Sequence, residues 1–224
     1  MVTTHKYVRV ADLSITQYVD ISTLENWNAK LSIRVCRAAL AYGFNSVVVP
    51  SFYAETVRNE FPSLRLTIPC NYLGLHAAEV VLREIEAITS LVEDQSNLWV
   101  EFVIPPYFRH YIREFRKLNM GWVKLIGILP TTTPKVSSLD EMVSLIKENP
   151  GVFDYVGFGV DEKTRGQAFV SYQKYGPPLK GKGFKLKLNG SYSNHEEVRA
   201  LVGQGVDLVG CVKAHNVIKE KVEL

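Results

Sequence analysis

The chain has 224 residues, of which 46% are hydrophobic and 22% charged, and its formal net charge is +3. This is ordinary globular composition, and so small and diffuse a charge gives no support for nucleic-acid binding. The chain contains no run of about 18 apolar residues, so we expect no membrane span. Residues 1–10 lack the apolar stretch of a signal peptide. Cys36, Cys70 and Cys211 have no metal-ligand spacing and form no CxxC pair, so we interpret them as core residues of a reduced, cytoplasmic protein.

The first half of the chain predicts four strands separated by helices. Short apolar runs predict strands at 18–22, 46–50, 64–69 and 97–104, and helical periodicity predicts helices at 29–42, 52–59 and 76–92. Gly43 is a typical helix stop, and Ser51 is placed to cap the second helix.

The second half repeats the pattern. It predicts strands at 121–128, 152–158, 183–188 and 206–210, and helices at 107–118, 139–147, 193–203 and 213–221. Ser138 with Glu141, and Ser193 with Glu196, have the spacing of capping boxes. Residues 161–175 are interpreted as a weak helix or a long loop, and 176–183, which contain Gly-Pro-Pro, as a flexible turn.

Eight strands alternating with about eight helices predict parallel βαβ units. The strands are apolar on both faces, as parallel strands are when helices cover them. An open doubly wound sheet also fits the alternation, but no GxGxxG follows the first strand, and eight repeats favour a closed barrel. We therefore expect an α/β fold, a (β/α)8 TIM barrel, as a single domain over residues 1–224 with 1–15 as an N-terminal extension.

Charged residues interrupt four of the predicted strands. They are Asp20, Glu101, Lys124 and Lys187, and Lys185 shares a face with Lys187. Because burying a charge is costly, they form either a structural ion-pair cluster or a catalytic site. A catalytic site would hold a lysine whose pKa a cationic neighbour lowers, with a carboxylate to move protons, which is the equipment of Schiff-base aldol chemistry.

Glycines follow the last two predicted strands. Small residues there expose backbone N–H groups, and the loops after strands seven and eight of a TIM barrel often bind phosphate. We predict a phosphate site at Gly190, Ser191, Gly210 and Lys213. The alternative is that these glycines only close tight turns.

Several segments, taken in order, resemble one family. Residues 18–24 are similar to an Ile-Asp-x-Thr-Leu strand, 123–126 to Val-Lys-Val-Ile, 187–190 to Lys-x-x-Gly-Gly and 205–210 to Gly-Ala-Asp-x-Ile-Gly. All four are motifs of the deoxyribose-phosphate aldolases, and the resemblance runs from about residue 18 to 220. It implies a lyase, a class I aldolase that cleaves 2-deoxyribose 5-phosphate through a Schiff-base lysine, without metal or organic cofactor.

The resemblance does not extend to the family's catalytic positions. The family's Schiff-base lysine lies on the sixth strand, where this chain has Gly157, and Phe158 and Gly159 replace the neighbouring hydroxyl residues. The family's second lysine corresponds to Lys187, and its aspartate to Glu101. Since glycine cannot form an imine, the family's mechanism cannot run unchanged on this chain.

Three hypotheses remain open. The first is an aldolase in which Lys187 or Lys124 forms the imine. The second is a catalytically inactive paralogue that binds a phosphosugar or serves as an assembly subunit. The third is a barrel enzyme in which Glu101 transfers a proton and Lys124 stabilises an enolate.

The expected partners are a small phosphorylated sugar or aldehyde and either a second copy of the chain, as a dimer, or an active paralogue. We expect neither a nucleic acid nor a membrane as a partner. Two groups of residues receive a structural interpretation. We interpret as packing or an oligomer surface the residues Tyr107, Phe108, His110 and Tyr111, and as a solvated face the residues Arg109, Arg113, Arg116 and Lys117.

Overall fold

A computed structural model describes most of the chain. The described residues are 8–12, 15–22, 29–71, 73–91, 97–105, 107–119, 123–130, 139–160, 163–190, 192, 194–211, 217 and 219–223. Within them, no helix has the length and hydropathy needed to cross a lipid bilayer.

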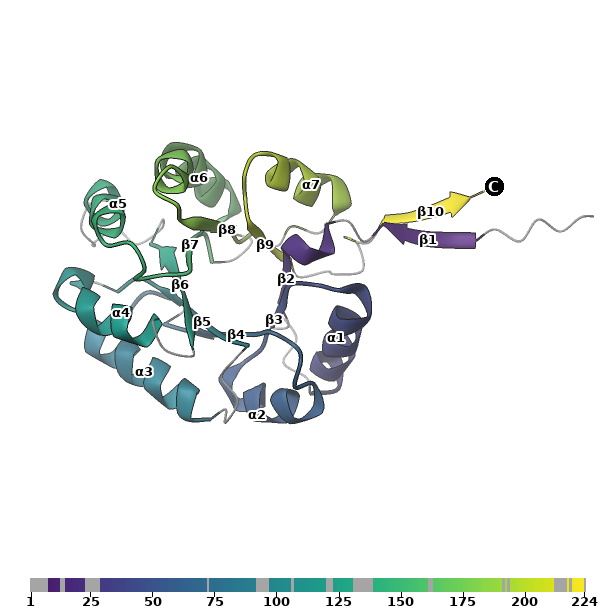
Figure 1. Ribbon diagram of the computed structural model, residues 1–224, viewed down its shortest axis with the longest axis horizontal. Coiled ribbons are helices and arrows are strands. Elements are labelled where there is room, and N and C mark those ends of the chain that lie inside the picture. The colour runs from purple at the N-terminus through teal and green to yellow at the C-terminus, as the bar shows by residue number, and fades with distance from the viewer. Residues whose placement is uncertain are drawn as a thin grey trace, which may run out of the picture.

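Eight parallel strands close into a barrel, which confirms the predicted α/β (β/α)8 fold (Figure 1). Each strand pairs in parallel with the next along the chain, and the ring closes where β2 pairs with β9. In chain order the strands are β2 (Val19–Ser22), β3 (Ser46–Val48), β4 (Leu66–Cys70), β5 (Leu98–Val103), β6 (Lys124–Leu129), β7 (Tyr155–Phe158), β8 (Lys185–Leu188) and β9 (Leu208–Cys211).

Helices surround the barrel on its outer side. They are α1 (Ala29–Tyr42), α2 (Ser51–Glu60), α3 (Ala78–Ser90), α4 (Ile112–Asn119), α5 (Leu139–Glu148), α6 (Arg165–Lys180) and α7 (His195–Gly203), with 3-10 turns η1 (Thr16–Tyr18) and η2 (Phe108–His110). The main apolar core fills the space between strands and helices, and a smaller cluster of Trp99, Val103, Ile126, Ile128, Tyr155 and Leu208 packs together apart from it.

Of the two alternatives for residues 161–175 the structure has the helix, from Arg165 on, but the flexible turn predicted at 176–183 was wrong for most of its length. One helix, α6, continues from Arg165 to Lys180 and includes Pro177 and Pro178, which we expected in that turn. Proline weakens a helix interior because it donates no backbone hydrogen bond. Here the buried side chains of Tyr172 and Leu179 anchor the helix on the barrel, and this packing overrides local propensity.

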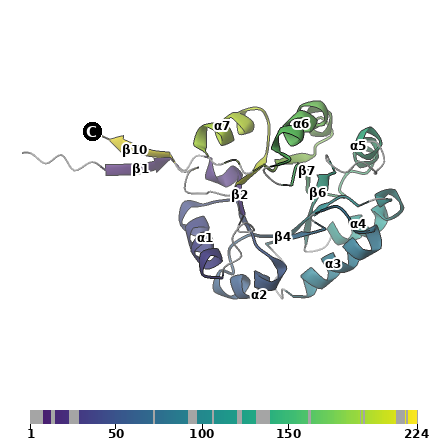
Figure 2. The ribbon, with the colours of Figure 1, turned by 180° about the vertical axis from the view of Figure 1, so that it is seen from behind.

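The predicted helix at 213–221 was wrong over residues 219–221, and residues 213–216 and 218 lie outside the described residues. Residues Lys219–Glu223 form strand β10, which pairs antiparallel with β1 (Val8–Asp12) in a two-stranded sheet outside the barrel. Figure 2 shows this sheet projecting from the side of the barrel near α7. A pairing between opposite ends of the chain leaves no signal in the periodicity of either segment.

The starts of two helices differ from the prediction. Ser51 is the first residue of α2, and its N-cap is Pro50, which makes no side-chain cap. In α7 the N-cap is Asn194, whose side chain accepts a hydrogen bond of 2.8 Å from the backbone N–H of Glu197. The predicted caps Ser138 and Ser193 lie outside the described residues.

The cysteines are free, and Cys36 and Cys211 are buried. Burial, with a smaller contribution from Glu60, raises the pKa of the Cys36 thiol to about 12, and burial raises that of Cys211 as well. We expect both thiols to resist a disulfide reagent in the native protein at about pH 8, since the thiolate is the reactive form. Mass spectrometry after labelling checks this. The unfolded chain, with three reactive thiols, is the control, and rapid native labelling of Cys36 would contradict the prediction.

Candidate functional site

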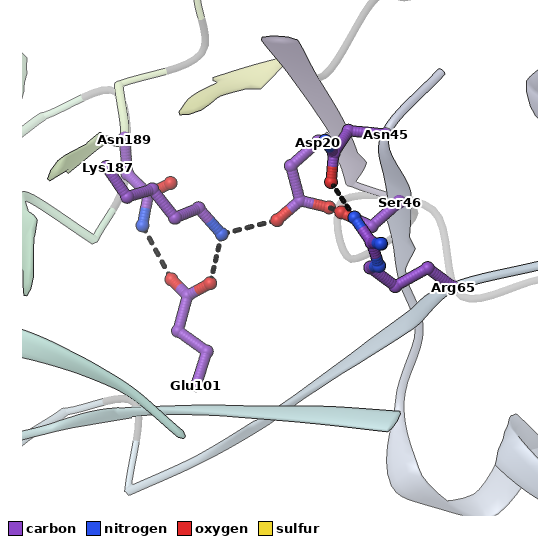
Figure 3. A network of polar contacts seen from close by, with 7 residues as sticks. All are labelled: Asp20, Asn45, Ser46, Arg65, Glu101, Lys187 and Asn189. Carbon is purple, nitrogen blue, oxygen red and sulfur yellow. Dashed lines mark hydrogen bonds and ion pairs between the residues drawn. The ribbon is translucent and has the colours of Figure 1, made fainter. Parts of the chain in front are cut away.

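Three charged side chains from three strands meet inside the barrel. The Nζ of Lys187 on β8 donates to Asp20 on β2 and to Glu101 on β5 (Figure 3). Since β2, β5 and β8 are not neighbours in the ring, their side chains can meet only across its interior. Lys187 is 1% exposed, Asp20 0% and Glu101 6%, so this ion-pair cluster of Asp20, Glu101 and Lys187 is almost fully removed from solvent.

Two neutral side chains complete the hydrogen bonding of the cluster. The hydroxyl of Ser46 donates to Asp20 Oδ1 at 2.7 Å, and the amide of Asn189 donates to Glu101 Oε1 at 2.6 Å. Lys187 occupies the other oxygen of each carboxylate. All four carboxylate oxygens therefore accept a hydrogen bond, as buried charges require.

The electrostatics of Lys187 are those of a stable ammonium. Burial alone would lower its pKa, but the charges and hydrogen bonds of Asp20 and Glu101 outweigh burial and hold the pKa of Lys187 above its usual value. The catalytic hypothesis expected a cation beside a lysine to lower its pKa. The neighbours that the structure places beside Lys187 are carboxylates, which act in the opposite direction.

Gly157 lies directly beside this cluster. It pairs in register with Lys187 across the β7–β8 ladder and with Ile128 across the β6–β7 ladder. A Cβ added at Gly157 would overlap the Cδ1 atom of Ile128. The space into which a side chain at position 157 would extend is therefore filled by the buried side chain of Ile128.

Lys124 lies at a different level of the barrel. It is the first residue of β6, as Lys185 is of β8. Because the strands are parallel, both lie at the N-terminal mouth, opposite the loops that follow the strands. The carboxyl group of Asp154 lies near both lysines. Burial raises the pKa of Asp154 above its usual value, although the charges of Lys124 and Lys185 partly oppose this effect. The structure thus brings together three of the four predicted catalytic residues and leaves Lys124 apart from them.

Of the predicted phosphate-binding residues, Gly190 and Gly210 are described, whereas Ser191 and Lys213 lie outside the described residues. A Cβ at Gly190 would lie 3.0 Å from the Cγ of Arg165, so this arginine covers the loop after β8. The Arg165 guanidinium stacks 4.3 Å from the ring centroid of Tyr192 and pairs with Glu197. Sequence reasoning missed Arg165 because it opens the helix that was interpreted as a weak helix or loop.

Gly210 makes room for Asn189. A Cβ at position 210 would overlap the Oδ1 atom of Asn189, whose amide group holds Glu101. We expect Gly210→Ala to displace this amide and to reduce the free energy of unfolding by about 1–3 kcal/mol, because a buried carboxylate oxygen loses its donor. Urea denaturation measures the loss. Gly203→Ala, where nothing lies within 4 Å of an added Cβ, is the control, and an equal loss in the two variants would contradict the explanation.

Comparison with known proteins gives matches at the level of structure. No family model and no curated protein matches the sequence. The deoxyribose phosphate aldolase from Aeropyrum pernix superposes with a TM-score of 0.68 at 18% identity, over 92% of this chain and 89% of that one. The chain shares the fold of the deoxyribose-phosphate aldolases.

Other barrel proteins share this fold. A protein described as QR15, an aldolase, superposes with a TM-score of 0.63 at 14% identity, over 92% of this chain and 95% of that one. KGPDC from Streptococcus mutans superposes with a TM-score of 0.60 at 12% identity, over 89% of this chain and 90% of that one. At such identities the likeness concerns the fold, and function must be argued from the site.

Proposed function

We propose that this chain is an aldolase-like barrel that binds a small phosphorylated sugar without cleaving it. The observation that carries the proposal is the geometry of Lys187, whose buried Nζ atom is held between the carboxylates of Asp20 and Glu101. An imine requires a neutral amine, and removing a proton from Lys187 would leave two buried carboxylates without a counter-charge. The packing of Ile128 against Gly157 supports the same conclusion, since a side chain at the family's Schiff-base position would have to displace the Cδ1 atom of Ile128.

The phosphate end of the ligand is assigned to the loop after β8. Arg165 lies against Gly190 and keeps 37% of its side chain exposed, at the end of the barrel where this fold binds phosphate. Its guanidinium offers paired N–H donors that suit phosphate oxygens. A bound phosphate would compete with Glu197, the present partner of Arg165.

Borohydride reduction in the presence of 2-deoxyribose 5-phosphate tests whether the chain forms an imine. We expect the intact mass of the protein to stay unchanged. If the mass does increase, peptide mapping of the reduced protein identifies the lysine that carries the adduct, either Lys187 or another. Either result overturns the proposal in favour of a working aldolase.

Calorimetric titration tests the other part of the proposal, which is that the chain binds a phosphorylated sugar. We expect 2-deoxyribose 5-phosphate to bind and 2-deoxyribose to bind at least about tenfold more weakly, because the phosphate supplies charge-assisted hydrogen bonds. Arg165→Gln should weaken binding of the phosphosugar by about tenfold. Arg199→Gln, on the exposed face of α7, is the matched control. Equal affinity for both sugars would contradict the assignment of Arg165.

An aldolase that uses Lys187 is the second candidate. One observation favours it, because Lys187 pairs in register with the position of the family's Schiff-base lysine and contacts Glu101, which could move a proton. In that case substrate binding must separate the ammonium from at least one carboxylate. An assembly role beside a lysine-bearing aldolase is a further form of the inactive-paralogue proposal, and co-purification of the two chains after co-expression would support it.

A further inference from the structure

Two adjoining hollows are lined by residues of η2, α4 and α5 and their flanking residues. The helices α4 and α5 lie on the outer side of the barrel (Figure 1). The hollows share Arg109 and His110, and their volumes are about 260 Å³ and about 450 Å³. Small-molecule sites have volumes of roughly 300–1,000 Å³, so the pair is large enough for one such ligand. The hollows are formed by a 3-10 turn and helices outside the strand ring, whereas the ion-pair cluster lies inside it.

The smaller hollow has one aromatic and apolar side. Tyr107, Phe108, Met142 and Leu145 form that side, and the remaining lining residues are Arg109, His110 and the acid Glu141. Tyr107 is 72% exposed, and its ring centroid lies 6.5 Å from that of His110. Such a surface suits a flat ring.

The backbone of Tyr107 is strained. Its φ is +60°, in the left-handed region, which is uncommon for a bulky residue. Strained residues of this kind cluster at ligand sites, where the surrounding structure maintains them. Here the strain accompanies a largely exposed tyrosine ring at the edge of a hollow, a position that burial in a core does not explain.

The larger hollow is lined by three arginines, Arg109, Arg113 and Arg116, against one acid, Glu114. Within the described part of the chain, neither Arg109 nor Arg113 forms an ion pair. Arg109 and Arg113 are exposed, so their guanidinium groups are accessible to a ligand and give this hollow a positive potential. The cluster therefore predicts an anionic ligand.

Arg116 adds an unsatisfied donor. Its Nη2 atom donates to Asn149 Oδ1 at 3.1 Å, but its buried Nε atom has no acceptor among the residues that the structure describes. A buried guanidinium N–H without an acceptor is costly, and native proteins rarely leave one. The exposed guanidinium groups of Arg109 and Arg113 offer paired N–H donors that suit phosphate oxygens, whereas protein atoms cover the Nε of Arg116, which meets a ligand only if its side chain moves.

We infer that these hollows bind a nucleoside phosphate, with its base against Tyr107 and His110 and its phosphates on the arginines. The ligand class follows from the juxtaposition of an aromatic compartment and an arginine-lined compartment that share two residues. This site is independent of the phosphosugar site proposed above, because it shares no residue with it. A face interpreted from sequence as solvated is thus assigned to a ligand.

Calorimetric titration of the full chain with ADP, adenosine and pyrophosphate tests the inference. ADP should bind, and adenosine and pyrophosphate should each bind at least about tenfold more weakly, since each engages one compartment. Arg109→Gln and Arg113→Gln should each weaken ADP binding by about tenfold and reduce its dependence on salt. The control Arg199→Gln should leave it unchanged. Absence of ADP binding, or unchanged affinity in the two hollow variants, overturns the inference.

Variants of Tyr107 test the aromatic compartment. Tyr107→Phe keeps the ring and should bind ADP as the parent does. Tyr107→Gly relieves the backbone strain but removes the ring, so it should retain the fold, checked by circular dichroism, and bind ADP several-fold more weakly. Equal binding by the two variants, or pyrophosphate bound as tightly as ADP, would show that no base is recognised and would refute the nucleotide assignment.

Discussion

Lys187→Met is expected to destabilise the protein by about 3–5 kcal/mol, because it leaves Asp20 and Glu101 as buried carboxylates without a counter-charge. Methionine has nearly the same length, so the loss reflects charge more than packing volume. Urea denaturation followed by circular dichroism measures it.

Two further variants separate electrostatics from packing. Lys185→Met changes the lysine two residues earlier on the same strand, which is exposed, and should cost much less. Adding Glu101→Gln and Asp20→Asn to Lys187→Met removes the unpaired charges and should restore part of the lost stability. If the triple variant is as unstable as Lys187→Met, the uncompensated carboxylates are not the cause.

Gly157→Lys is expected to destabilise the protein by about 3 kcal/mol or more instead of creating an aldolase. The new side chain would overlap Ile128 and bring a second ammonium beside Lys187. Thermal or urea denaturation measures the loss, and borohydride reduction with 2-deoxyribose 5-phosphate should produce no adduct. A stable Gly157→Lys variant that forms an adduct would show that the barrel interior still accommodates the imine.

A double-mutant cycle isolates the steric part of this effect. Gly157→Ala should cost about 1–3 kcal/mol through overpacking. Ile128→Val removes the Cδ1 atom that the new methyl group would meet, so the double variant should be more stable than the sum of the single losses predicts. Strict additivity would show that Ile128 does not close position 157.

The fold was predictable because its signals are local. Apolar runs and helical periodicity predicted all eight barrel strands, and their alternation with helices predicted the barrel. The errors arose where contacts between residues far apart in the sequence determine the local secondary structure. The anchoring of α6 by Tyr172 and Leu179 overrides two prolines, and β10 forms because β1, from the other end of the chain, supplies its partner.

The sequence predicted most of the residues that form the candidate site, but it did not predict the chemistry that their arrangement allows. A charge within an apolar strand is a strong signal, and three of the four marked residues do meet. What sequence could not reveal is which charges are neighbours, and therefore whether the pKa of Lys187 is lowered or raised. Nor could it reveal that Ile128 fills the space beside Gly157, because this depends on side-chain packing between adjacent strands.

The link between Lys187 and Asp20 spans 167 positions of the sequence, and the ring closes only when β9 reaches β2. Contacts of such long range form late and slow folding, because the entropy of closing large loops must be overcome first. During synthesis, Asp20 leaves the ribosome long before its counter-charge exists and must stay hydrated until β8 has been made. The emerging N-terminal half should therefore remain open to chaperones for most of translation.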